Sequence, residues 1–152
     1  MNWTEYFLNI AEQVKLKSKD QSTQIGAVIV GIDNEVLSTG YNSFPRGMDD
    51  SKQERQERPE KYFWMEHAER NAIYNAARIG VSTKNTTMYL SCGIPCADCA
   101  RGIINAGITR IFCERGELGT KGPMWADSAE RSWEMFDEAG VEVCFYDEPF
   151  HV

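Results

Sequence analysis

Two short stretches, His67-Ala68-Glu69 and Pro95-Cys96-Ala97-Asp98-Cys99, constrain this chain more than any other feature of its sequence. One imidazole and two thiolates at i and i+3 are three zinc ligands. Three protein ligands leave a coordination position for water, whereas a closed structural site uses four. Glu69 stands two residues beyond the histidine, where its carboxylate is available to move protons. The pattern therefore predicts an open, catalytic zinc site.

The fold has to bring these two stretches together. A helix from His67 to Arg78 carries the chain away by about 1.5 Å per residue, and a strand from Thr86 to Ser91 returns it by about 3.3 Å per residue. The two legs nearly cancel, so a second helix that starts at Cys96 begins beside the first. Helix starts favour negative charge, which helps to keep both cysteines as thiolates.

Helical and extended patterns alternate along the rest of the chain. A helix is expected from Thr4, its predicted cap, to about Lys17, and a hairpin from the strands Ile25 to Val30 and Glu35 to Tyr41. The later elements are expected as a helix from His67 to Gly80, a strand from Thr86 to Ser91, a helix from Cys96 to Gly107, a strand from Arg110 to Cys113, a glycine-rich loop from Arg115 to Trp125, a helix from Ser128 to Ala139, and a strand from Val141 to Phe145. This order favours an α/β sandwich with parallel neighbouring strands.

The segment from Asp49 to Lys61 is rich in charges of both signs. It is predicted to be a solvated loop or short helix, with a lid, an effector site or a subunit contact as the functional alternatives. The aromatic run Tyr62-Phe63-Trp64 that follows is predicted to pack in the core rather than to line a pocket.

Composition limits the classes of protein that need to be considered. The 152 residues fit a single catalytic domain, 1–152, and the formal charge of −7 argues against a polynucleotide-binding surface. The chain lacks a membrane-spanning apolar run and a signal-like start, which predicts a cytoplasmic location. Five cysteines make a secreted disulfide framework improbable and favour a reducing compartment. Cys113 and Cys144 are expected to be buried packing residues.

The zinc motif and four further stretches resemble the zinc-dependent deoxycytidylate (dCMP) deaminases. These stretches are Ser18 to Ala27, Gly40-Tyr41-Asn42, and the residues that extend the two motifs, Arg70-Asn71-Ala72-Ile73 and Ala100 to Ile104. The first motif pair is the general signature of base deaminases. The resemblance spans roughly residues 18 to 143.

The resemblance implies a three-layer α/β/α cytidine-deaminase-like sandwich with a mixed five-stranded sheet. It implies hydrolytic deamination of dCMP to dUMP, which supplies dTMP synthesis, with one zinc ion on His67, Cys96 and Cys99 and with Glu69 catalytic. It further suggests that Asn42 contacts the deoxyribose and that the Ala68 backbone reads the pyrimidine edge. Members of this family commonly form homo-oligomers, with a hexamer expected before a dimer, and are often regulated by dCTP and dTTP, in which Mg would accompany the effector.

Some positions depart from the family pattern. Ile94 replaces the Phe or Ser common before the proline, so Phe44 or Trp125 is expected to supply the wall on which the base stacks. Glu66 replaces a cysteine common before the histidine. Lys19 and Arg46 are the expected contacts of the 5′-phosphate, because a monophosphate needs a compact group of cations.

Several alternatives stay open on the residues alone. Cys92 could join His67, Cys96 and Cys99 in a closed structural zinc site, which would leave Glu69 without a role. Other substrates within the same chemistry are dCTP, 5-substituted dCMP, CMP, guanine and tRNA adenosine, of which the last fits poorly with an acidic chain. A non-catalytic nucleotide-sensing module would have no need of Glu69.

Overall fold

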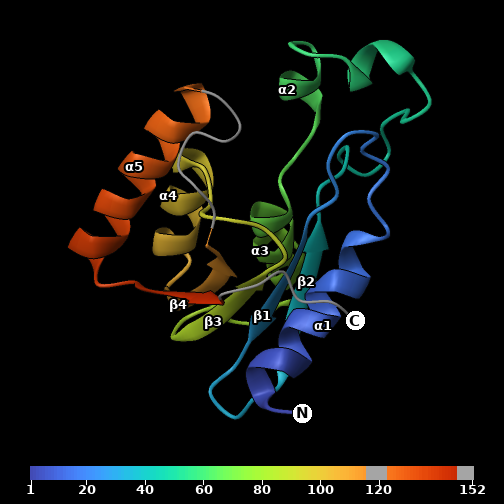
Figure 1. Ribbon diagram of the computed structural model, residues 1–152. Helices are drawn as coiled ribbons and strands as arrows, with labels where there is room; N and C mark the ends of the chain where they lie inside the picture. Colours follow the sequence, from blue (N-terminus) through green and yellow to red (C-terminus); the bar gives the residue numbers. More distant parts are fainter. Residues whose placement is uncertain (116–122, 147–152) are drawn as a thin grey trace.

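A mixed sheet is the centre of the molecule. The computed structural model describes residues 1–115 and 123–146, and in this part of the chain five strands pair in the order β2-β1-β3-β4-β5 (Figure 1). Strand β1 pairs antiparallel with β2 and β3, while β3, β4 and β5 are parallel. The strands are β1 (Gly26–Val30), β2 (Val36–Tyr41), β3 (Thr86–Leu90), β4 (Ile108–Glu114) and β5 (Glu142–Tyr146).

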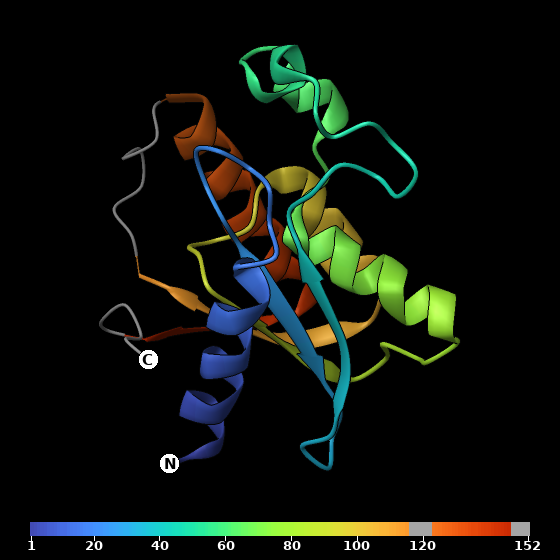
Figure 2. The same cartoon turned by 90° about the vertical axis from the view of Figure 1, so that its right-hand side faces the viewer.

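Helices cover both faces of this sheet. Because side chains of a strand alternate between faces, Val28 and Val30 pack on α1, whereas Ala27 and Ile29 join the opposite core. That opposite core includes side chains of α3, α4 and α5 (Figures 1 and 2). The helices are α1 (Trp3–Lys15), α3 (Ala68–Ile79), α4 (Ala97–Asn105) and α5 (Pro123–Ala139). The expected three-layer sandwich with a mixed five-stranded sheet is confirmed.

The first helix is capped by a different residue from the one predicted. Helix α1 starts at Trp3, and Asn2, not Thr4, is its N-cap. The Asn2 side chain accepts a hydrogen bond from the Glu5 amide at 2.9 Å, and the Glu5 carboxylate accepts one from the Asn2 amide at 2.9 Å. This reciprocal pair satisfies two otherwise unpaired amides, which Thr4 inside the helix could not do.

Helix α5 is longer than predicted. It starts at Pro123, five residues before the expected start at Ser128. Proline suits the first position of a helix, because its φ is already helical and no backbone donor is needed there. Trp125 therefore lies on a helix rather than in the predicted loop. Residues 116–122 of that loop lie outside the described residues.

The charged segment forms two short turns of helix that stand away from the sheet (Figures 1 and 2). They are η1 (Gln53–Gln56) and α2 (Lys61–Trp64), in agreement with the predicted short helix. The prediction that the aromatic run packs in the core is wrong, because Phe63 is 82% exposed and Tyr62 is 44% exposed. A four-residue helix has one inward side, and Lys61 occupies it.

Helix α3 lies unusually close to strand β2. A β-carbon at Gly40 would overlap backbone atoms of Ala68 and Ala72. Glycine is therefore required at this position, and the first turns of α3 rest directly on the strand. The close contact fixes the height of the N-terminus of α3 above the sheet. Helix α3 ends as predicted at Gly80, whose φ of +78° lies in the left-handed region.

Candidate metal centre

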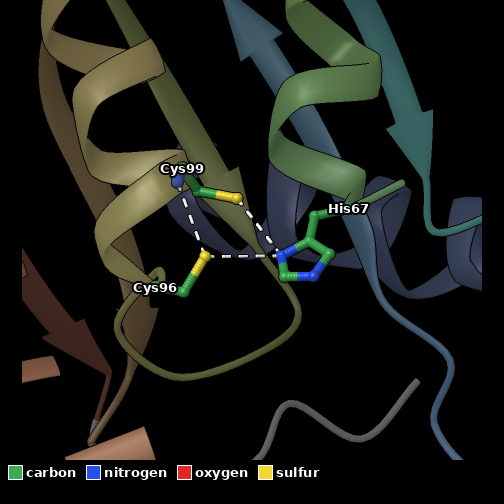
Figure 3. Close-up of side chains that lie close together, drawn as sticks. All are labelled: His67, Cys96 and Cys99. Carbon is green, nitrogen blue, oxygen red and sulfur yellow. Dashed lines mark hydrogen bonds between the residues drawn. The ribbon is translucent and has the colours of Figure 1, made fainter. Parts of the chain in front are cut away.

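Three potential metal ligands meet between the starts of two helices (Figure 3). His67, Cys96 and Cys99 place one ligand atom each within 4.8 Å of one another. The His67 Nδ1 atom is 3.5 Å from the Cys96 sulfur and 3.3 Å from the Cys99 sulfur. One imidazole nitrogen and two thiolate sulfurs are a donor set that zinc prefers, with a fourth position left to fill.

The local sequence explains why the ligands meet. His67 is the N-cap of α3 and Cys96 is the N-cap of α4, so both residues stand at helix starts. Helix α3 leads the chain away and strand β3 brings it back, which confirms the predicted cancellation of the two legs. Pro95 is fully buried just before the second helix and restricts the backbone that leads into Cys96.

The three groups polarise one another. The Cys99 thiol and the imidazole of His67 both hydrogen-bond to the Cys96 sulfur, and together they lower the pKa of Cys96 to about 4. The same pairing with Cys96 raises the pKa of Cys99. The hydrogen bond with Cys96 raises the pKa of His67. The cluster thus shares protons that a bound cation would displace.

Glu69 lies on the first turn of α3, beside this cluster. Its side chain is only 3% exposed, and burial raises the pKa of its carboxyl. Among the described residues, its Oε1 is one of two buried side-chain polar atoms without a hydrogen-bond partner. A buried carboxyl oxygen that lacks a partner carries a free-energy cost, and such groups are found where a ligand or reaction uses them.

A charged pair links the two helix starts behind the ligands. Glu66 accepts hydrogen bonds from the His67 amide at 3.0 Å and from the Arg70 Nε at 2.8 Å. The Arg70 guanidinium also lies 3.8 Å from Asp98, which stands between the two cysteines. Arg70 thus connects the residue before the histidine to the residue between the thiols. Asp98 is paired in turn with Arg101.

The fourth cysteine of the closed-site alternative is not part of the cluster. Within the described residues, the metal-ligating group contains His67, Cys96 and Cys99 but not Cys92. The Cys92 thiol donates instead to the carbonyl of Gly93 at 3.4 Å. Cys113 is fully buried in the core, as expected, and Cys144 is partly buried.

The predicted substrate contacts are placed in different surroundings. Asn42 is 5% exposed; its Nδ2 donates two hydrogen bonds and its Oδ1 accepts one, all with neighbouring segments. Lys19 is exposed and paired with Asp50 at 2.8 Å. Arg46 is exposed and donates to the Asn75 side chain at 2.7 Å. Ala68 is fully buried at the start of α3.

Of the two candidate aromatic walls, Trp125 lies beside the cluster. Its ring centroid is 6.5 Å from that of His67, with the planes tilted by 34°. The Tyr62 ring packs edge-on against Trp125, also with a centroid distance of 6.5 Å. Phe44 is 8% exposed.

Sequence reasoning assigned no role to three residues that the structure makes prominent: Arg70 beside the ligands, and the pair Asp20 and Lys61. The spacing of Glu66 and Arg70 at i and i+4, across the start of a predicted helix, is a signal for the first. Asp20 and Lys61 form a buried ion pair over a separation of 41 positions, for which the sequence offers no local signal.

The comparisons with known proteins agree with this geometry. Residues 1–115 match the family described as "Cytidine and deoxycytidylate deaminase zinc-binding region". An uncharacterised deaminase from Aliivibrio fischeri, encoded in the luxG 3′ region, is 39% identical over 142 residues, with 93% of this chain and 91% of the relative covered. Human deoxycytidylate deaminase is 35% identical over 146 residues, which cover 93% of this chain and 78% of the relative.

A solved structure shares the fold. The dCMP deaminase of cyanophage S-TIM5, crystallised with dCMP and dUMP, superimposes with a TM-score of 0.73 at 22% identity. The match covers 93% of this chain and 95% of the phage protein.

Among the described residues, no helix has both the length and the apolar character that crossing a membrane requires.

Proposed function

Because the chain belongs to the cytidine and deoxycytidylate deaminase family, we propose that it is a zinc-dependent hydrolase that converts dCMP to dUMP and ammonia. Such a reaction supplies the precursor of dTMP. The observation that carries the proposal is the junction of His67, Cys96 and Cys99 beside the buried, unpartnered Glu69 oxygen. A closed structural site has no use for such a carboxyl. Residues 1–152 act as one catalytic domain in this proposal, supported by a sheet whose strands range from Gly26 to Tyr146.

The donor set fits one zinc ion held by His67, Cys96 and Cys99. Zinc in a three-ligand site supplies a nucleophile at neutral pH by lowering the pKa of a water to about 7. The chain contributes the rest of the chemistry. His67 offers Nδ1 to the site, so its other ring nitrogen faces away from the sulfurs (Figure 3). The two helix starts offset the charge of the thiolates.

Glu69 is the proton carrier. Burial disfavours its charged form, and so its carboxyl readily holds a proton taken from the attacking water. Glu69 passes that proton to the ring nitrogen of the cytosine and then assists the departure of ammonia. A group that works alternately as base and acid benefits from a pKa raised towards neutrality.

The nucleotide contacts complete the proposal. Trp125, next to His67, provides the aromatic wall for the base in preference to Phe44, whose ring is buried. The Ala68 backbone reads the pyrimidine edge. Asn42 contacts the deoxyribose: both of its amide hydrogens are already donated within the protein, so it can only accept from a sugar hydroxyl.

Lys19 and Arg46 serve the 5′-phosphate in this proposal. Each would exchange its present partner, Asp50 or Asn75, for the phosphate. Both side chains are exposed, so the exchange disturbs no packing.

The first test is a substrate panel. Purified protein with its zinc content measured is incubated with dCMP, dCTP, CMP and deoxycytidine, and loss of cytosine absorbance is followed together with ammonia release. Turnover of dCMP is expected. If none of these four compounds reacts, even with dCTP and Mg added, the cytosine assignment is wrong, and guanine and tRNA adenosine are the substrates to examine next.

Regulation by dCTP or dTTP, with Mg, is part of the same proposal. The segment 49–64 contains a hollow of about 550 Å³ lined by Arg55, Arg58 and Trp64 together with Pro59 and three glutamates. Guanidinium groups suit the phosphates of a nucleoside triphosphate, an indole suits its base, and carboxylates suit its Mg ion. Activity measured with dCTP and dTTP, before and after an Arg55→Gln/Arg58→Gln change, tests this; no response to either nucleotide would remove it.

Assembly into a homo-oligomer, a hexamer before a dimer, is supported by large apolar side chains at the surface. Phe63, Ile79 and Met124 are 82%, 66% and 61% exposed. Light scattering on a sizing column measures the assembly directly, and a monomer would contradict it.

The cytoplasm suits this chemistry, since the two thiols of the site have to stay reduced.

A further inference from the structure

Lys61 is a buried cation that the proposed chemistry does not use. It lies on α2, in the segment that otherwise stands away from the sheet, and is only 5% exposed. Its Nζ is 2.7 Å from each carboxylate oxygen of Asp20 and 2.7 Å from the Ser22 hydroxyl. A lysine is almost never buried unless it is paired, so this position has to be explained.

Its partner Asp20 accepts more hydrogen bonds than an ordinary carboxylate. Besides Lys61, the Oδ1 atom accepts from the Ser22 amide and hydroxyl at 2.8 and 3.0 Å, and from the Thr23 amide at 3.1 Å. The Oδ2 atom accepts from the side-chain amide of Asn42 at 3.2 Å. Both oxygens of Asp20 must therefore be acceptors, which only the carboxylate form provides.

Asn42 is held in one orientation by this network. Its Nδ2 donates to Asp20 and, at 2.7 Å, to the Thr23 carbonyl, while its Oδ1 accepts from the Ile25 amide at 2.8 Å. One lone pair on Oδ1 is left over, because an amide oxygen has two. If the amide turned over, it would present a donor to the Ile25 amide and an acceptor to the Asp20 carboxylate. The Asp20 carboxylate and the backbone of Thr23 and Ile25 thus favour the same orientation, in which Oδ1 keeps a lone pair for a ligand, and Lys61 acts on this orientation through Asp20.

The backbone next to Asn42 is tied to the candidate metal centre. Ser43 exchanges backbone hydrogen bonds of 3.0 and 2.8 Å with Glu66, the residue before His67. The Asn71 side chain, one turn into α3, donates to the Tyr41 carbonyl at 2.8 Å. The backbone on both sides of Asn42 is therefore held in place relative to the candidate metal centre.

We propose that Lys61, acting through Asp20, is a positioning residue that keeps the Asn42 Oδ1 ready to accept a hydrogen bond from the 3′-hydroxyl of the nucleotide sugar. The inference rests on the proposed function. The 3′-hydroxyl is the free hydroxyl of a 2′-deoxynucleoside 5′-monophosphate, so it is the donor that such an acceptor can meet.

The test compares two substrates in one preparation: dCMP and 2′,3′-dideoxycytidine monophosphate, which lacks the 3′-hydroxyl. The wild-type protein should prefer dCMP in kcat/KM by at least about tenfold, because the acceptor would be left unpaired by the analogue. In Lys61→Met this preference should fall by at least about threefold, mainly through the KM of dCMP. A preference is a ratio, so incomplete folding of a variant lowers both activities and leaves it unchanged.

Two further variants make the test decisive. Lys52→Met removes an exposed lysine of the same segment and should keep the full preference for dCMP. Asp20→Asn is used if Lys61→Met does not fold. The new side-chain amide has one oxygen, so it must direct its NH₂ group either towards Asn42 or towards Ser22 and Thr23. Because Ser22 and Thr23 hold Oδ1 by three hydrogen bonds, the oxygen stays with them and Asn42 loses its acceptor. The preference should then fall as in Lys61→Met.

The outcomes separate two kinds of failure. If the wild-type protein deaminates neither nucleotide, the proposed function is wrong, and this is known before any variant is compared. If the wild type turns over dCMP without preferring it over the dideoxy analogue, or if the variants that fold keep the full preference, Lys61 does not position Asn42. Equal loss on both substrates would assign Lys61 a structural role alone and would overturn the inference.

Discussion

The metal-ligating corner, formed by His67, Cys96 and Cys99, and the Lys61–Asp20 pair both join residues that are far apart in the chain. His67 and Cys96 are 29 positions apart, and Asp20 and Lys61 are 41 positions apart, but the fold brings each pair together in a different way. His67 and Cys96 stand at the ends of regular elements, so their meeting follows from helix and strand lengths. Lys61 starts the four-residue helix α2 and Asp20 lies in an irregular segment, so only the complete fold brings them together. The metal-ligating corner brings together groups that can bind a metal ion, whereas the Lys61–Asp20 pair has its charges balanced within the protein.

The sharpest test of this contrast is the removal of the acid–base group from the corner. Glu69→Gln keeps the shape of the side chain but cannot take up a proton, so turnover of dCMP should fall by at least about 10²-fold. Zinc content should not change, because Glu69 is not among the three grouped ligands. Ammonia release and elemental analysis measure both quantities. Loss of zinc, or activity near that of the wild type, would contradict the assigned role.

The buried pair should dominate stability instead. Lys61→Met leaves the Asp20 carboxylate buried without its cation, which costs about 3–5 kcal/mol in the free energy of unfolding. Urea unfolding measures the loss, and Lys52→Met is the matched control with an exposed lysine. Equal changes in the unfolding midpoint for both substitutions would show that the buried pair contributes no more to stability than an exposed lysine does.

Arg70 offers a test at the boundary of the corner. Loss of its bridge between Glu66 and Asp98 in Arg70→Met should weaken zinc binding by about 10–100-fold, as is typical for groups that orient metal ligands. Competition with a chelator gives the affinity without any reference to activity. Arg101→Met is the control, since Arg101 is more than half exposed and, within the described part of the chain, pairs with Asp98 and not with Glu66. An unchanged affinity in Arg70→Met would mean that the two helix starts need no bridge.

The smallest expected effect is on the response to acid. Burial opposes the charge of Asp20, but hydrogen bonds from Lys61, Ser22 and Thr23 prevail and lower its pKa below the ordinary 3.8. A lowered pKa means that the stability contributed by Asp20 is present above pH 3.8 and is lost as the pH falls through the folded-state pKa. Lys61→Met should reduce this acid-dependent loss in urea unfolding, while Lys52→Met should preserve it. Parallel pH curves for both variants would exclude the effect.

The same contrast explains what the sequence could predict. The ligand corner could be predicted because its residues carry chemistry at short spacing, and because a helix and a strand of estimable length separate the two motifs. The burial of Lys61 could not, because a lysine in a charged segment normally remains in solvent. The aromatic run after it was placed in the core for its composition, yet a helix of four residues has no second side to bury.

Helix ends were predicted less well than helix existence. Thr4 is the predicted cap, but the spacing of Asn2 and Glu5 is that of a capping box, and Asn2 caps the helix. Pro123 falls within the predicted loop, although a proline before a helical pattern is a start signal. The second error placed Trp125 in a loop, whereas its helix holds the ring beside His67.

The tight seat of α3 on β2 at Gly40 has a genetic consequence. A random screen for loss of function would recover substitutions at Gly40, although this residue is remote from any reacting atom in sequence and carries no side chain. Even a methyl group there has to lift α3, and with it the histidine and the carboxyl at its start. Such alleles should lower stability as well as activity, and a smaller side chain at a neighbouring position should not suppress them, because the overlap is with the backbone of Ala68 and Ala72.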